Sequence, residues 1–140
     1  MSKARLLLSL AAVAVTSLLL VTSCFSQGAV NSFYDAGAED VSISSEQMSQ
    51  YVLYRFETSG SGHTLTLPSA ADIIDKVDSP TIGQLFIMVV AADGINPVTV
   101  TGGTGMVIKT SATEVAGNTT QSLYFVITNT SSGTQSITVY

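Results

Sequence analysis

Residues 63–74 read HTLTLPSAADII, and this stretch combines the two patterns that decide the fold. HTLTL alternates polar and apolar side chains, which is typical of a β-strand with one buried face. Pro68 ends the strand, and Ser69 with Asp72 three residues later predicts a capping box at the start of a helix. We expect a short helix over about 69–77, with one apolar face made of Ala70, Ile73, Ile74 and Val77.

The segments on both sides continue the strand pattern. Upstream lies YVLYRFE (51–57), followed by the turn signal SGSG. The downstream strand candidates are IGQLFIMVVAA (82–92), PVTVT (97–101), MVIKT (106–110), TTQSLYFVIT (119–128) and QSITVY (135–140), with turn residues between them. The pattern predicts an all-β domain over 50–140, a single antiparallel β-sandwich or jelly-roll-like domain of seven or eight short strands with one short helix.

Two of these strands are apolar on both faces, namely LFIMVV (85–90) and LYFVI (123–127). One short helix can cover only one of them, and an exposed apolar patch indicates a partner. We therefore expect self-association through apolar strand surfaces, and the candidates are Leu85, Ile87, Val89, Leu123, Phe125 and Ile127. The alternative is that both strands lie centrally in a fully two-layered core.

The N-terminus has the pattern of an export signal. Lys3 and Arg5 precede sixteen uncharged, mostly apolar residues at 6–21. This run is shorter than the about 20 residues of a membrane-spanning helix. The following V-T-S-C resembles a bacterial lipobox, which implies that residues 1–23 are removed and that Cys24 is lipidated. Two alternatives are ordinary cleavage after Gly28 or Ala29, and a retained N-terminal anchor.

Residues 24–49 show no sustained period, so we interpret them as a tether or leader segment. Within it, Val41 and Ile43 alternate briefly with serines. This short segment could add as a strand to the open sheet edge of a neighbouring molecule.

Charge and composition exclude several classes of protein. The 117 residues from Cys24 onward carry three basic and ten acidic side chains, a net charge of −7, so nucleic-acid binding is not expected. His63 is the single histidine, and its surroundings lack a nucleophile elbow. Asp72, Asp75 and Asp78 fit the solvated face of a helix better than a calcium loop. We expect no catalytic residues, no metal site and no cofactor.

Four segments carry a resemblance to a known domain. They are TLTLPSAADII (64–74), GQLF (83–86), NPVTVTGGTG (96–105) and YFVITNTSSGTQSITVY (124–140). In this order they resemble a small β-rich domain of tail-associated and capsid-fibre proteins of bacteriophages and large DNA viruses. The resemblance implies a non-enzymatic, surface-displayed domain, often trimeric, that serves structure or attachment.

The expected function is that of an exported surface structural protein that associates with itself, as a trimer or a filament subunit. It would be a cell-surface or outer-membrane lipoprotein, bound to the membrane by its lipid, or an extracellular protein. One alternative is a tethered module that recognises a glycan or a host surface, with Tyr51, Tyr54 and Tyr124 as stacking rings. Another is a virion structural protein with a retained anchor.

Overall fold

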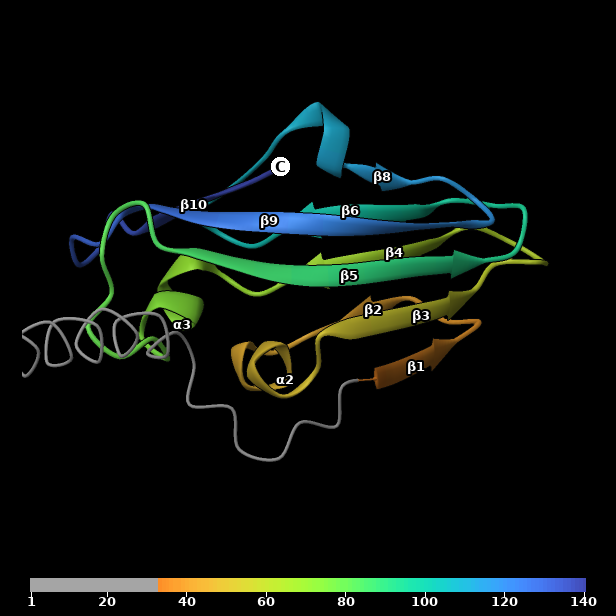
Figure 1. The fold of residues 1–140 in the computed structure, drawn as a ribbon, viewed down its shortest axis with the longest axis horizontal. Helices are drawn as coiled ribbons and strands as arrows, with labels where there is room; N and C mark the ends of the chain where they lie inside the picture. Colours follow the sequence, from red (N-terminus) through yellow and green to blue (C-terminus); the bar gives the residue numbers. More distant parts are fainter. Residues whose placement is uncertain (1–32) are drawn as a thin grey trace, which may run out of the picture.

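The computed structural model describes residues 33–140, which form two β-sheets (Figure 1). Sheet A has the strand order β1-β3-β5-β9-β10-β7, and sheet B has the order β2-β4-β6-β8. The strands of sheet A are β1 (Phe33–Gly37), β3 (Leu53–Glu57), β5 (Leu85–Asp93), β7 (Met106–Ile108), β9 (Thr119–Asn129) and β10 (Ser136–Val139). Those of sheet B are β2 (Val41–Ser42), β4 (His63–Leu67), β6 (Val98–Gly102) and β8 (Glu114–Val115). The prediction of a β-rich chain with little helix is confirmed.

The prediction of antiparallel sheets is wrong, because both sheets are mixed. Strand β3 pairs in parallel with β1 and β5, and β4 pairs in parallel with β2 and β6. After each of its first six strands, the chain crosses to the opposite sheet. When it comes back to a sheet, the new strand runs in the same direction as the previous strand of that sheet, as β1, β3 and β5 do. Parallel neighbours need such a crossover, and here a strand of the other sheet supplies it.

Several turn signals in the sequence therefore join strands of different sheets. SGSG connects β3 of sheet A to β4 of sheet B, and Asp93-Gly94 connects β5 to β6 in the same way. The turn at 129–135 connects β9 to β10, which are antiparallel neighbours within sheet A. A turn signal marks a reversal of the chain, but it does not say whether the reversal stays within one sheet.

The predicted tether is too long, because residues 33–49 already contribute strands and most of a helix to the domain. Strand β1 pairs with β3, β2 pairs with β4, and the helix α2 (Ser45–Gln50) follows. A capping box starts α2: the Gln47 N–H donates to the Ser44 hydroxyl (3.1 Å), and the Ser44 N–H donates to the Gln47 side chain (2.9 Å). Of the predicted 24–49 segment, residues 33–49 thus belong to the domain.

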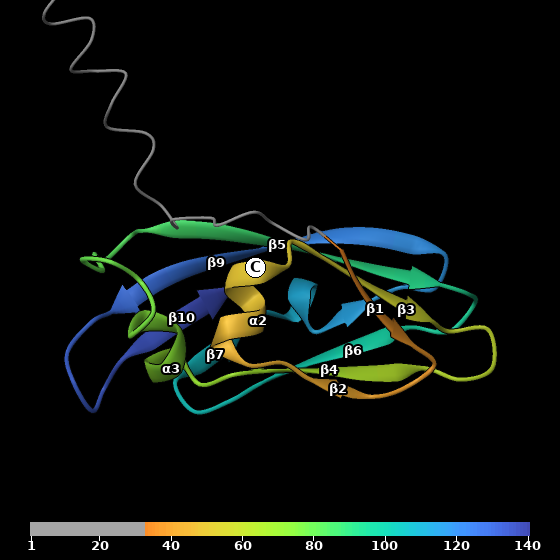
Figure 2. The ribbon, with the colours of Figure 1, turned by 90° about the horizontal axis from the view of Figure 1, so that it is seen from below.

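The two sheets lie over one another as two layers (Figure 2). Alternate side chains of both sheets point inward and form one core cluster. Its members in sheet A include Tyr54, Phe56, Val90, Leu123 and Phe125, and those in sheet B include Leu65, Leu67, Val98, Val100 and Val115. Phe125 stacks on Phe86 with ring centroids 5.0 Å apart. The buried members of this cluster run from Ile43 to Val139 along the chain, so one core extends through the whole of this range.

The predicted helix is present but short, as α3 (Ala70–Ile74), and it lies at one end of the two layers (Figure 1). Its four predicted apolar residues are buried, and Ala70, Ile73 and Ile74 belong to the core cluster. Ser69 caps it, accepting from the Asp72 N–H (3.1 Å). The Asp72 carboxylate accepts from the Ser69 hydroxyl (2.6 Å), so the pair differs from the predicted capping box. Because α3 closes an end, the outer face of sheet A stays uncovered by it.

Candidate interaction surface

Strand β5 divides its apolar residues between the two faces of sheet A. Met88, Val90 and Ala92 point into the core. Leu85, Ile87 and Val89, which alternate with inward residues, point outward, and Leu85 and Ile87 are about half exposed. Successive side chains of a strand face opposite sides, so a strand that is apolar throughout leaves one apolar side toward solvent when nothing covers it.

Neighbouring strands extend this outward surface in register. Tyr124 and Val126 of β9 lie opposite Ile87 and Leu85, and Leu53 of β3 lies beside Val89. Tyr140 exchanges two backbone hydrogen bonds with Tyr124 (3.0 and 3.1 Å), which puts both rings on the same side. We call this surface the apolar face; its residues are Phe33, Leu53, Leu85, Ile87, Val89, Val107, Tyr124, Val126 and Tyr140.

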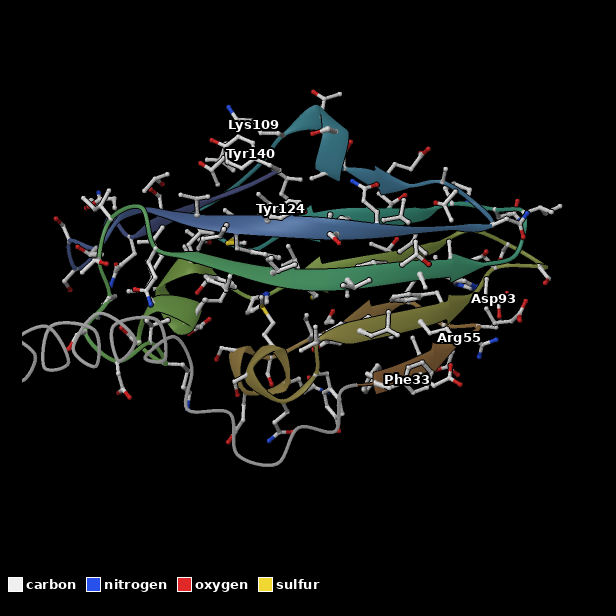
Figure 3. All side chains as sticks on the ribbon, in the orientation of Figure 1. Phe33, Arg55, Asp93, Lys109, Tyr124 and Tyr140 are labelled. Atoms are coloured by element: carbon white, nitrogen blue, oxygen red, sulfur yellow. The ribbon has the colours of Figure 1, made fainter. Side chains whose placement is uncertain are left out.

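An ionic network borders the apolar face at one end of the strands (Figure 3). Arg55 is its centre: its guanidinium donates to Asp35 (3.2 Å) and to Asp93 through both Nε (3.1 Å) and Nη2, and it lies 4.0 Å from Glu57. The hydrogen bond to Asp93 raises the pKa of Arg55. Three carboxylates surround one guanidinium, so this end of the face has an excess of negative charge.

The outer face of sheet B is polar. Its outward side chains are Ser42 on β2, Thr64 and Thr66 on β4, Thr99 and Thr101 on β6, and Glu114 on β8. The hydroxyls of Thr66 and Thr101 hydrogen-bond across the two strands (3.1 Å). Sheet B therefore has the alternation expected of a sheet with one wet side, whereas sheet A does not.

The six self-association candidates separate into two groups. Leu85, Ile87 and Val89 lie on the apolar face. Leu123, Phe125 and Ile127 are fully buried in the core, so they are not available to a partner. The outward apolar residues of β9 are Tyr124 and Val126, and neither is among the six candidates. The sequence shows that Tyr124 and Val126 alternate with the buried residues. Only the pairing of β9 with β5 shows which of the two sets faces outward.

The strand-addition candidates lie within the chain's own sheet. Val41 pairs with Leu65 in sheet B, and the N–H of Ile43 donates to the Thr66 carbonyl (3.0 Å), with the Ile43 side chain in the core. Adding this segment to a neighbouring molecule would thus require its exchange out of its own domain. The lipidation candidate Cys24 lies outside the described residues.

The three proposed stacking tyrosines are not together. Tyr124 is on the apolar face, whereas Tyr54 is fully buried and Tyr51 is half-buried. Tyr51 and Tyr54 pack with Tyr34 in an aromatic cluster whose ring centroids are 5.4–6.3 Å apart. The full burial of Tyr54 gives this ring a packing role, and the same burial raises the pKa of its hydroxyl.

His63 is also an inward side chain. It lies at the start of β4, its Nδ1 is 3.7 Å from the Asp40 carboxylate, and its Nε2 is buried without a hydrogen-bond partner in the structure. The same Asp40 carboxylate accepts from the Thr64 N–H (2.7 Å), which ties the β1–β2 connection to β4. The described contacts of His63 are thus those of a side chain packed at the margin of the core.

No family model, curated protein or solved structure gives a significant match to this chain. Among residues 33–140, no helix has the length and apolar character needed to cross a membrane.

Proposed function

We propose that this protein is an exported, non-enzymatic structural protein of the cell surface that associates with itself through the apolar face. The observation that carries the proposal is the clustering of exposed apolar side chains on one face of sheet A. Of the eight large hydrophobic residues exposed within 33–140, six lie on the apolar face: Phe33, Leu85, Ile87, Val107, Tyr124 and Tyr140. An apolar patch of several hundred Å² with polar residues at its border often serves an interaction.

The size of the apolar face fits a protein partner. A large apolar side chain has about 150–200 Å² of surface, so six that are half exposed offer roughly 500 Å². The half-buried Leu53, Val89 and Val126 enlarge this surface. The total approaches the about 800 Å² that each partner contributes to a standard interface. A second copy of the chain is a suitable partner, because other copies are present wherever the protein is made.

The proposal includes export and lipidation at Cys24, followed by an anchor in the membrane. Between Cys24 and Phe33 there are eight residues, which can span at most about 30 Å. Stable anchoring takes two or more acyl chains, as the lipobox resemblance implies. The domain would thus be kept close to the membrane, where confinement of the copies raises their effective concentration and favours association.

We further propose that the two mixed sheets constitute a β-sandwich of the kind used in virion fibre and tail domains. The shared core between two layers and the polar outer side of sheet B support this proposal. The chain crossings between the sheets distinguish it from a simple antiparallel sandwich.

Recognition of a glycan or a host surface is the second candidate function. Tyr124 and Tyr140, which are neighbours across two strands and are both about half exposed, favour it because aromatic rings stack on sugars and on other flat groups. In that case the apolar face would stay open in the purified protein, ready for its ligand.

Concentration-dependent stability tests the self-association. A shortened chain of residues 25–140 keeps the whole core cluster and lacks the signal. Its melting temperature should rise with protein concentration, because only the folded copies associate. Ile87→Asp should abolish this dependence, whereas Ile95→Asp, at a 76% exposed turn position away from the apolar face, should keep it. A wild-type melting temperature independent of concentration would favour the recognition function.

Lipidation needs a separate test in the full-length chain. The exported wild type should enter the detergent phase and carry the mass of acyl chains, while Cys24→Ser should accumulate as uncleaved precursor. Equal mature mass and equal solubility of the two would refute lipidation but leave the self-association intact.

A further inference from the structure

We infer that the partner is a second copy bound face to face, so that the apolar face pairs with itself in a closed two-fold dimer. This inference rests on the proposed self-association and adds the geometry of the contact. An isologous contact uses the same patch on both copies, whereas a ring or filament formed by heterologous contacts needs two different, complementary patches.

The described residues offer one apolar patch and no second one. Outside the apolar face, the exposed large hydrophobic residues of 33–140 are Ile82 and Ile95, which lie singly in turns. The outer side of sheet B is made of hydroxyl and carboxylate side chains. A filament, as expected from the sequence, would have to pair the apolar face with one of these polar surfaces, and a closed trimer would have to divide the face between two neighbours. Pairing it with itself buries apolar surface on both sides.

The ionic network indicates how the two copies are oriented. It carries excess negative charge and lies at the end of the strands beyond Leu53 and Val89, while Ile87 and Tyr124 lie farther from it along β5 and β9. Like charges placed opposite each other across an interface are unfavourable. A two-fold axis that crosses the strands near Ile87 and Tyr124 puts the two networks at opposite ends of the dimer, where both stay in water.

This arrangement brings Ile87 of one copy opposite Ile87 of the other. Two sheets that pack face to face are about 10 Å apart. The shortened chain 25–140 contains no cysteine, so Ile87→Cys introduces its single thiol. A thiol-specific cross-linker that spans about 10 Å should then join two copies through the same position. Thr101→Cys, on the outer side of sheet B, is the matched control and should stay uncoupled.

Sedimentation equilibrium of the chain 25–140, together with this cross-linking, tests the inference. We expect the mass of a dimer, coupling of Ile87→Cys alone, and a dissociation constant raised roughly 100-fold or more by Ile87→Asp. Circular dichroism should show that Ile87→Asp keeps its β-sheet. Tyr124→Asp repeats the test on the neighbouring strand β9.

A trimer, a ladder of larger species, or coupling through Thr101→Cys would overturn the two-fold dimer while leaving self-association standing. A dimer in which Ile87→Cys fails to couple would overturn the proposed orientation. A folded monomer at high concentration would overturn both this inference and the proposed function.

Discussion

Ile87 and Tyr124 lie directly opposite each other on two antiparallel strands, and both side chains are about half exposed, 47% and 44%. Their immediate neighbours Met88 and Leu123 are buried. The same two strands thus hold the core with one face and present apolar groups to solvent with the other. Stability and association are therefore separable by substitutions at adjacent positions.

Phe125 and Tyr124 provide the test of this separation. Phe125→Ala should lower the free energy of unfolding by about 3–5 kcal/mol, because it opens a cavity beside Phe86 in a packed core. Tyr124→Ala should cost less than about 1 kcal/mol in the monomer, because its ring is half exposed. Urea denaturation, at a protein concentration low enough to prevent association, measures the free energy of unfolding of both variants. Equal losses would contradict the assignment of the two faces.

The cap of α3 gives a second prediction. Ser69→Ala removes the acceptor of the Asp72 N–H and should lower the free energy of unfolding by about 0.5–2 kcal/mol. Ser132→Ala, at an exposed turn position, is the control and should change it by less than about 0.5 kcal/mol. Denaturant unfolding of the two variants compares them, and an unchanged Ser69→Ala would mean that α3 does not need this cap.

The strands that alternate in the sequence were predicted well. HTLTL coincides with β4, and the strand expected at 97–101 differs from β6 by one residue. The apolar side of the helix was also correct, because Ala70, Ile73, Ile74 and Val77 depend only on local spacing. Such features follow from near neighbours in the chain, which is why one sequence suffices to find them.

Features that depend on distant partners could not be predicted. Strand β1, FYDAG, has no clear period, and its pairing with β3 in parallel depends on contacts twenty residues away. LYFVI is apolar at every position, so its inward side is decided by the register with β5. The S-x-x-Q pattern at Ser44–Gln47, by contrast, is a local capping-box signal, so the start of α2 was predictable from the sequence.

A tight turn gives the third prediction. A Cβ atom at Gly117 would overlap the backbone carbonyl of Ile95, and backbone cannot rotate away as a side chain can. Gly117→Ala should therefore lower the free energy of unfolding by more than about 1 kcal/mol. Gly60→Ala is the matched control, since a Cβ there meets nothing within 4 Å. In thermal unfolding, Gly60→Ala should melt at or above the temperature of wild type, and Gly117→Ala should melt below it. A Gly117→Ala variant that melts as high as Gly60→Ala would contradict the turn geometry.

The fourth prediction concerns acid pH. Hydrogen bonds from the Ser59 hydroxyl and from the Ser59 N–H (3.0 Å) lower the pKa of Glu57. A carboxyl with a lower pKa in the folded state stabilises the fold above its unfolded pKa of about 4.3. This contribution is lost as the pH falls through the folded pKa.

The advantage of wild type over Glu57→Gln should therefore be constant near neutral pH and decline below about pH 4.3. Ser59→Ala removes the hydroxyl donor and should reduce part of the same pH dependence. Unfolding free energies measured across this range check the result. A difference between wild type and Glu57→Gln that is the same at every pH would show that Glu57 has no such role.

Side-chain oxidation by hydroxyl radicals tests the central claim, that the apolar face is covered in the assembled protein. The chain 25–140 should be labelled at high concentration and compared with its dissociated Ile87→Asp variant. We expect Leu85 and Tyr124 to be several-fold less modified in wild type. Ile82 and Ile95, which are 69% and 76% exposed and lie off the face, should react equally in both proteins and serve as internal references. Equal labelling of Leu85 and Tyr124 in the two proteins would contradict the account.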